Sequence, residues 1–289
     1  MQSTIESIQS WVGKEENVTD TISGSVAERL AATLNRETNN TYPVQTNLPH
    51  LWHWCHFIKP SPQSSLGEDG HSAKGNFLPP ITLPRRMWAS SSLHFRHPLQ
   101  IGLFANRQSQ ITNIQEKHGR SGKLIFVTLK HNFFQEKQLV LSEEQNLVYR
   151  NHPPKKSEEP SLKMSNENIG DYTAVIQPNT TELLRYSALT FNSHRIHFDQ
   201  SYTTKIEGYP GLIVQGPLIA THLLELAYRS LGIETLNSLE KFEFRAKNPA
   251  FVDKLLHLSC SKLDKNRFIH LSAKNELGIE CMAAKATIK

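Results

Sequence analysis

The densest group of chemically active side chains lies in the stretch Leu-Thr-Phe-Asn-Ser-His-Arg-Ile-His-Phe-Asp-Gln, residues 189–200. This stretch contains an asparagine, two histidines, an arginine and an aspartate, which are Asn192, His194, Arg195, His197 and Asp199. Side chains of these types can bind a metal ion, carry out acid–base catalysis or stabilise a polar turn. Their spacing and their surroundings help to choose among the three.

A metal site fits the spacing poorly. His194 and His197 are three residues apart, whereas zinc-binding histidines on one helix are usually four apart. The other histidine-rich stretch, His-Leu-Trp-His-Trp-Cys-His at 50–56, alternates like a strand whose residues face opposite ways. We therefore interpret residues 50–56 as a strand and expect no metal ion.

Acid–base chemistry fits better. His197 can take a proton from water near neutral pH, and Asn192 can orient that water without accepting its proton. Gly216 follows nineteen residues after His197 and opens an apolar helix, where free N–H groups favour negative charge and a ligand can approach the backbone closely. A base, a bound water and an oxyanion donor are what the hydration of an α,β-unsaturated thioester requires.

Two helices are expected. Residues 215–232 place Gly216 at the N-cap, Pro217 at the first helical position and Gly232 after the end, and the polar Thr221, Glu225 and Arg229 leave the rest of the surface apolar. Such a helix is largely buried. The second helix covers residues 24–35.

The chain divides near its middle. Residues 151–170 are rich in Pro, Lys, Glu and Ser and read as a linker between an N-terminal half, 1–150, and a C-terminal half, 171–289. Similar strand-like segments follow in the same order in both halves, 93–114 then 124–134 in the first and 242–263 then 268–278 in the second. We infer an internal duplication with one site per chain, because the unusual motif and its helix occur in the second half alone.

Composition narrows the cellular setting. The net charge is +5, but the basic residues are scattered, which argues against nucleic acid as a partner. The sequence has no apolar run long enough to cross a bilayer and begins with no secretory or mitochondrial targeting pattern. Three widely spaced cysteines suit a reducing compartment, and we expect a cytoplasmic protein.

Residues 185–226, Arg-Tyr-Ser-Ala-Leu-Thr-Phe-Asn-Ser-His-Arg-Ile-His and onward to Gln-Gly-Pro-Leu, resemble the hydratase segment of the MaoC-like hot-dog superfamily. The branch with an Asn-Ser-His-Arg-Ile-His core contains the type 2 hydroxyacyl-thioester dehydratases and the mesaconyl-C4-CoA and itaconyl-CoA hydratases. Residues 83–95, 116–131 and 143–150 are similar to the N-terminal half of those hydratases. The resemblance implies an α+β double hot-dog fold, in which two antiparallel sheets each wrap around a helix. It assigns catalysis to the C-terminal half and leaves the N-terminal half as a non-catalytic wall of the substrate pocket.

The resemblance also assigns roles to residues. The catalytic histidine of the family corresponds to His197 and the oxyanion glycine to Gly216, while Asn192 and Gln215 replace an aspartate and a histidine that are common in the family. Gln215 becomes a residue of the substrate pocket. No metal or redox cofactor is implied, since the CoA thioester is itself the substrate.

Three further side chains have two interpretations each. Arg195 either binds a second substrate carboxylate or stabilises the turn by binding Asp199 or a backbone carbonyl, and Tyr186 either lines the pocket or packs in the core. Arg86, next to Arg85, either binds a carboxylate or a CoA phosphate or is solvated.

The expected function is reversible hydration of an enoyl-CoA, with mesaconyl-C4-CoA or itaconyl-CoA and citramalyl-CoA as the best match. A 3-hydroxyacyl-thioester dehydratase of fatty acid synthesis and a non-catalytic acyl-CoA-binding protein are the alternatives. The sequence leaves open the acyl chain, the physiological direction, CoA versus acyl-carrier-protein thioesters, and the oligomeric state, for which a homodimer of double hot-dogs is one option.

Overall fold

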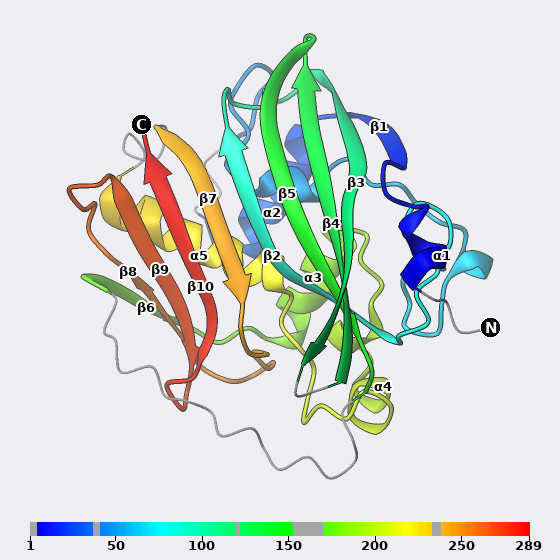
Figure 1. The fold of residues 1–289 in the computed structure, drawn as a ribbon. Coiled ribbons are helices and arrows are strands. Elements are labelled where there is room, and N and C mark those ends of the chain that lie inside the picture. The colour runs from blue at the N-terminus through cyan, green and yellow to red at the C-terminus, as the bar shows by residue number, and fades with distance from the viewer. Residues whose placement is uncertain (1–4, 37–40, 120–121, 153–169, 233–237) are drawn as a thin grey trace.

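One antiparallel sheet of ten strands runs through both halves of the chain (Figure 1). The computed structural model describes residues 5–36, 41–119, 122–152, 170–232 and 238–289. The strand order is β1-β3-β4-β5-β2-β7-β10-β9-β8-β6. The strands are β1 (Glu15–Thr21), β2 (Arg85–Phe95), β3 (Phe104–Gly119), β4 (Gly122–Gln135), β5 (Gln138–Arg150), β6 (Tyr172–Ile176), β7 (Leu239–Ala246), β8 (Leu256–Cys260), β9 (Phe268–Asn275) and β10 (Glu280–Ile288).

The sheet has the same strand order on both sides of its centre. Counted within each half, the order from the outer edge inward is first, third, fourth, fifth, second, both for β1–β5 and for β6–β10. The two second strands, β2 and β7, pair with each other from Ser90↔Arg245 to His94↔Lys241. This repeat is the duplication that the order of the sequence segments predicted, and it makes the fold a double hot-dog.

Helix α1 (Ile5–Gln9) precedes β1, and the other helices of the described residues lie between the first and second strands of each half. These are α2 (Gly24–Thr33), α3 (Thr180–Leu189), α4 (Gln200–Lys205) and α5 (Gly216–Leu231), with short 3-10 helices η1 (Trp52–Cys55), η2 (Gln63–Ser65) and η3 (Arg195–His197). Helix α2 confirms the helix expected at 24–35 and ends two residues earlier than expected. Helix α5 confirms the second expected helix and packs against β6, β8, β9 and β10, behind the strands of the second half in the view of Figure 1.

Helix α5 is more deeply buried than its sequence indicated. Its N-cap is Gln215, one residue before the expected Gly216, and Gly232 ends it at φ +82°. Thr221 and Glu225 of the expected polar stripe are only 2% and 3% exposed. Arg36, after α2, makes two hydrogen bonds of 2.6 Å to the Glu225 carboxylate, so the first half covers this face of the helix.

The main apolar core joins the two halves. It includes Leu30 of α2 and Leu93 of β2 from the first half, and Leu218 and Phe242 from α5 and β7. Because α2 and α5 pack against one sheet in a single cluster, each half covers apolar side chains of the other. The core therefore fixes the position of α5 relative to the first half.

The histidine-rich stretch at 50–56 is not the expected strand, because Leu51 has a left-handed backbone at φ +70° and opens the 3-10 helix η1 instead. His53 and His56 are nevertheless buried, and His53 Nε2 lies 3.5 Å from Glu143 Oε2. Most of the expected linker, 153–169, lies outside the described residues.

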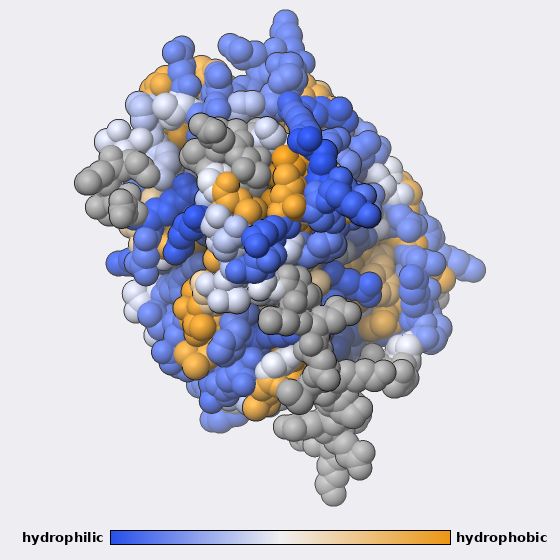
Figure 2. All heavy atoms as spheres, turned by 90° about the vertical axis from the view of Figure 1, so that its left-hand side faces the viewer, coloured by the Kyte–Doolittle hydropathy of each residue, from blue (hydrophilic) through white to orange (hydrophobic). Residues whose placement is uncertain are grey.

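The face of the second half that Figure 2 shows is mainly hydrophilic, with apolar patches that are small and separate. Among the described residues, no helix combines the length and the apolar character needed to cross a membrane.

Candidate active site

His197 ends the 3-10 helix η3 between α3 and α4, and it is 7% exposed. Its Nδ1–H donates a hydrogen bond of 2.7 Å to the carbonyl oxygen of Ile213, so Nε2 carries the free lone pair. Burial lowers the pKa of His197 to about 4, although the hydrogen bond to Ile213 opposes this shift. At neutral pH the side chain is therefore an uncharged base whose tautomer is fixed by the backbone.

Asn192 is positioned by the turn that follows α3. Its backbone N–H donates to the Ser187 carbonyl at 2.8 Å, and its Oδ1 accepts the His194 N–H at 3.1 Å. With Oδ1 used in the turn, the two Nδ2–H donors of Asn192 have no partner among the described residues. They can donate to a water molecule but cannot take its proton.

Gly216 begins α5, where the first N–H groups of a helix have no partner within it. A Cβ atom placed on Gly216 would meet only the Met282 Cε, at 3.9 Å. The backbone at this helix end therefore has room for a ligand. The helix dipole favours negative charge there, as an oxyanion site requires.

Gln215 is 1% exposed and connects the start of α5 to α3. Its Nε2 donates to the Leu183 carbonyl at 2.9 Å and to Ser187 Oγ at 3.0 Å. Its Oε1 is buried and, within the described part of the chain, has no hydrogen-bond partner. An acceptor left in this state next to Gly216 suits contact with a donor group of a ligand.

Arg195 forms part of the frame that supports His197. Its Nε and a terminal nitrogen bind Asp199 Oδ2 at 3.0 and 2.7 Å, the other terminal nitrogen donates to the Glu68 carbonyl at 3.0 Å, and the guanidinium lies 4.3 Å from the centre of the Tyr202 ring. Asp199 also caps α4 by accepting the Tyr202 N–H. Of the two roles considered for Arg195, these contacts favour stabilising the turn over binding a substrate carboxylate.

Tyr186 lies in α3 and is 2% exposed, as a member of the main core. Burial raises its pKa well above the usual range, and Thr221 of α5 lies within hydrogen-bonding reach of its hydroxyl. Of the two interpretations of Tyr186, pocket lining and core packing, this environment favours core packing.

A loop of the first half, residues 67–71, docks onto this turn, and its role was not expected from the sequence. The Arg195 N–H donates to the Asp69 carbonyl at 2.9 Å, and Ser193 Oγ donates to the Gly70 carbonyl. Gly70 has φ +86°, and a Cβ atom on it would lie 2.0 Å from the Ser193 carbonyl oxygen. Only glycine allows this approach. The glycines that flank Asp69 in Gly-Glu-Asp-Gly-His were the signal available in the sequence.

The docked loop brings a further histidine to the site. His71 Nδ1 is 2.9 Å from Asp69 Oδ2, and the His71 ring lies 4.1 Å from the His194 ring, centre to centre. The His194 ring in turn contacts that of His197 edge-on at 5.5 Å. We call His71, His194 and His197 the histidine cluster.

The electrostatics of the cluster keep its imidazoles neutral. Burial, together with the charge of Arg86, lowers the pKa of His71 to about 4, while Asp69 opposes this shift. Burial and the two neighbouring imidazoles lower the pKa of His194 further. Burial works against ionisation of Asp69, but its hydrogen bonds with His71 prevail and lower its pKa.

Asp69, His71 and His194 offer ligand atoms within 4.8 Å of one another, which is close enough to hold a metal ion. The positive charge of Arg86, which acts on all three groups, disfavours an added cation. That the protein uses no metal stays a prediction.

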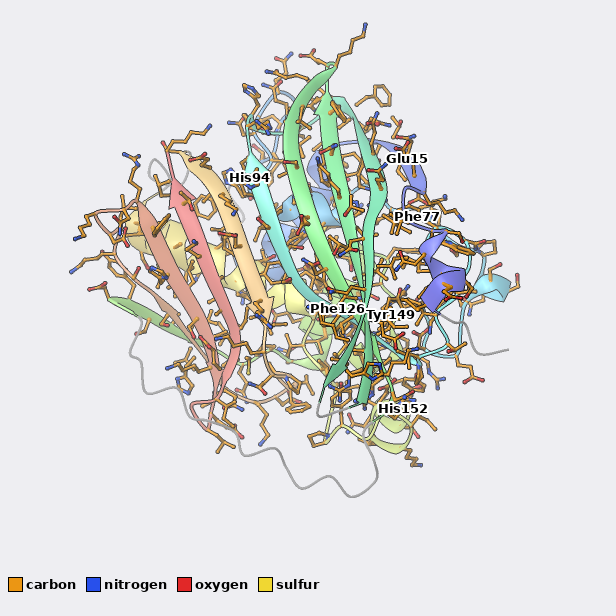
Figure 3. All side chains as sticks on the ribbon, in the orientation of Figure 1. Glu15, Phe77, His94, Phe126, Tyr149 and His152 are labelled. Atoms are coloured by element: carbon orange, nitrogen blue, oxygen red, sulfur yellow. The ribbon has the colours of Figure 1, made fainter. Side chains whose placement is uncertain are left out.

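The two adjacent arginines at the start of β2 have different environments. Arg85 is buried with Glu207 at 2.6 Å and lies 4.5 Å from the Tyr209 ring, so it joins the first half to the loop before α5. Arg86 is opposite Tyr149 in the β2–β5 register, and its charge acts on His71 and His194. Figure 3 labels Tyr149 on β5, and it labels His152, whose Nδ1 is 3.7 Å from the Glu207 carboxylate, near α4.

Comparisons with known proteins show the family of the chain. Residues 51–252 match the family of hydroxyacyl-thioester dehydratases type 2, and the chain belongs to that family. The chain is 42% identical over 242 residues to a mesaconyl-C(4)-CoA hydratase of Chloroflexus aurantiacus, covering 83% of this chain and 84% of the relative. It is 31% identical over 247 residues to the mitochondrial hydroxyacyl-thioester dehydratase type 2 of Schizosaccharomyces pombe, covering 75% and 79%.

Solved structures support the fold. A MaoC-like dehydratase superposes with a TM-score of 0.71 at 13% identity, over 97% of this chain and 99% of that one. A Mycobacterium tuberculosis protein described as a double hot-dog fold superposes with a TM-score of 0.55 at 12% identity, over 96% of both chains. The double hot-dog prediction is confirmed, and the curated relatives identify the protein as a hydratase or dehydratase, that is, a carbon–oxygen lyase.

Proposed function

We propose that the protein reversibly adds water to the double bond of a C5 dicarboxyl enoyl-CoA, with mesaconyl-C4-CoA or itaconyl-CoA as substrate and citramalyl-CoA as product. The observation that carries the proposal is a neutral, buried His197 with its Nε2 free, in the same half as the open N-terminus of α5 at Gly216. The 42% identity to a mesaconyl-C(4)-CoA hydratase supports the choice of acyl group.

With mesaconyl-C4-CoA, whose double bond is conjugated with the thioester, His197 Nε2 takes one proton from water while the water oxygen bonds to the β-carbon of the thioester. Asn192 Nδ2 donates to that oxygen and orients it. Electrons of the double bond move to the thioester oxygen, and the Gly216 N–H holds the resulting enolate. The His197 imidazolium then returns its proton to the α-carbon, so atoms and charge balance without a metal or a redox cofactor.

Arg86 would bind the free carboxylate of a dicarboxyl substrate. Its charge already acts on His71 and His194, and Arg85 next to it is paired with Glu207. Because a hydrogen bond to a charged group contributes about 1.5–3 kcal/mol, Arg86→Ala is expected to raise KM for mesaconyl-C4-CoA by ~10–100-fold. The KM for crotonyl-CoA, which has no second carboxylate, should change little. Arg96→Ala, at an exposed arginine of the same half, is the control.

The proposal is tested by following the loss of enoyl-thioester absorbance with mesaconyl-C4-CoA and crotonyl-CoA, and by measuring citramalyl-CoA chromatographically with itaconyl-CoA, whose double bond is not conjugated with its thioester. His197→Ala is expected to lower kcat by ~10²–10⁴-fold, the usual contribution of a general base. His257→Ala, at an exposed histidine of β8, should behave like the wild type. Near-full activity of His197→Ala would overturn the mechanism.

The same assay separates the alternatives. If the protein hydrates crotonyl-CoA but neither dicarboxyl substrate, the result would favour a dehydratase of fatty acid synthesis. The 31% identity to a type 2 dehydratase supports this alternative. Binding of all three thioesters without turnover would favour a non-catalytic binding protein.

For the cell, we propose a reducing compartment such as the cytoplasm, which the three buried free cysteines Cys55, Cys260 and Cys281 support. A homodimer of double hot-dogs stays a prediction, and light scattering of the purified protein would decide it.

A further inference from the structure

The loop at 67–71 holds an aspartate–histidine pair at the catalytic turn in a single defined orientation. Asp69 Oδ1 accepts the backbone N–H of His71 at 3.0 Å, and Asp69 Oδ2 pairs with His71 Nδ1 at 2.9 Å. Both carboxylate oxygens therefore accept from the same residue. The tautomer of His71 is fixed as a result, because an ionised carboxylate can pair only with a protonated Nδ1.

The free nitrogen of His71 is consequently an acceptor. Its Nε2 has no hydrogen-bond partner among the described residues, and the side chain is 22% exposed. The ring lies against His194, which contacts His197. His71 and His197 therefore have the same arrangement: Nδ1–H donates a hydrogen bond to an oxygen, and Nε2 keeps a free lone pair.

A hydration reaction has a use for a second acceptor. The attacking water has two protons, of which His197 takes one, while the other stays on the oxygen and becomes the proton of the product hydroxyl. An acceptor for this second proton directs a lone pair of the water toward the β-carbon and orients the hydroxyl for the reverse reaction.

We propose that His71, oriented by Asp69, is the second water-binding group of the active site, and that it accepts a hydrogen bond from the attacking water through Nε2. The proposal deepens the hydratase function and rests on it. His71 gains and loses no proton in the cycle, which agrees with the lowered pKa of its imidazole. The first half of the chain then contributes directly to the site of the second.

Asp69→Asn provides a specific test. The amide oxygen of the substituted side chain must accept the His71 backbone N–H, so its NH₂ group faces His71 Nδ1. Nδ1 must then be the acceptor, which moves the imidazole proton to Nε2 and turns the water acceptor into a donor. The substitution reverses the polarity of the side chain and leaves its shape almost unchanged. Glu68→Gln makes the same chemical change one residue earlier, on an exposed side chain.

His71→Phe and His71→Gln complete the series. Phenylalanine keeps a ring against His194 but has no acceptor, whereas the glutamine Oε1 reaches roughly the place of Nε2. We expect Asp69→Asn and His71→Phe to lower kcat on mesaconyl-C4-CoA by ~10–100-fold, the range for a lost site hydrogen bond, with KM within about threefold of wild type. The loss in His71→Gln should be smaller, and Glu68→Gln should match the wild type.

Three measurements accompany the kinetics. Nitrogen-15 NMR of the imidazoles should show His71 protonated at Nδ1 in the wild type and at Nε2 in Asp69→Asn. Thermal unfolding should give similar Tm values for Glu68→Gln and the His71 variants. Metal analysis after dialysis against a chelator should show that activity persists in metal-free protein.

Wild-type kcat in His71→Phe, or in Asp69→Asn with its tautomer switched, would overturn the proposal. So would one tightly bound divalent ion per chain whose removal abolishes activity, since Asp69, His71 and His194 would then be metal ligands. If the wild-type protein hydrates none of the three thioesters, the proposed function itself fails. If it hydrates one and the variants match it, only the role of His71 fails.

Discussion

Substituting Gly70 by alanine tests whether the loop at 67–71 must stay docked on the catalytic turn. A Cβ atom on residue 70 would lie 2.0 Å from the Ser193 carbonyl oxygen, and 3.0 Å from its carbonyl carbon. Neither atom can yield easily, because both belong to the backbone of the turn that carries His194. The left-handed conformation of residue 70, φ +86°, adds a strain of ~1–2 kcal/mol for an L side chain.

The loss in unfolding free energy of Gly70→Ala can be estimated from the hydrogen bonds that the clash breaks. If the loop withdraws, the hydrogen bonds from Arg195 N–H to Asp69 and from Ser193 Oγ to Gly70 are lost, at about 0.5–1.5 kcal/mol each. Together with the backbone strain, we expect the free energy of unfolding to fall by ~2–5 kcal/mol. Because Asp69 and His71 leave with the loop, kcat should also fall by at least ~10-fold.

Gly13→Ala is the matched control. Gly13 has φ +90°, and no atom lies within 4 Å of a Cβ placed there, so this variant carries the backbone strain without the clash. Urea unfolding and the enoyl-thioester assay compare the two proteins. Equal stability and equal kcat in Gly70→Ala and Gly13→Ala would refute the argument that the loop is held by close backbone contact.

Three further predictions concern His197, the Arg85–Glu207 pair and Gly216. Because burial lowers the pKa of His197 to about 4, the base stays unprotonated as the pH falls from about 7 to about 5. We expect kcat/KM to decline only as the pH approaches about 4, and a decline centred near the ordinary histidine pKa of about 6.5, with the fold intact by circular dichroism, would contradict this. Arg85→Met leaves the buried Glu207 carboxylate without its partner and should lower the unfolding free energy by ~3–5 kcal/mol, with a smaller loss in Arg85→Met/Glu207→Leu. Urea titrations of both variants measure this, and equal losses would show that the unpaired charge is not the cause. Gly216→Ala meets only Met282 Cε, at 3.9 Å, so its Tm should stay near the wild-type value while kcat/KM falls by at least ~10-fold. Unchanged turnover would show that the thioester does not approach this backbone.

Local signals in the sequence were sufficient to predict the main elements of the second half. Pro217 and Gly232 predicted the limits of α5 to within one residue, since both act on the backbone of their own neighbourhood. The order of strand-like segments predicted the duplicated sheet, and the family motif located His197 at a site whose geometry suits a base.

Signals that depend on distant contacts were misread or missed. The alternation in residues 50–56 suggested a strand, but the left-handed backbone of Leu51 starts a 3-10 helix there. Nothing in the composition of α5 showed that Arg36, 189 residues earlier, would cover Glu225. Asp69 and His71 were missed for the same reason, because their importance comes from docking against residues 193–195.

The pairing of β2 with β7 has a consequence for how this enzyme can evolve. Two identical hot-dog subunits that associate through these strands are related by symmetry, so every substitution appears twice, once near each copy of the site. In the fused chain a substitution appears once. A substitution in the loop at 67–71 can therefore be selected for its effect on a single active site, with no second copy forced to accommodate it. In a fused chain the two halves are free to become unlike each other, and at the contact between Gly70 of the first half and Ser193 of the second each side can change separately.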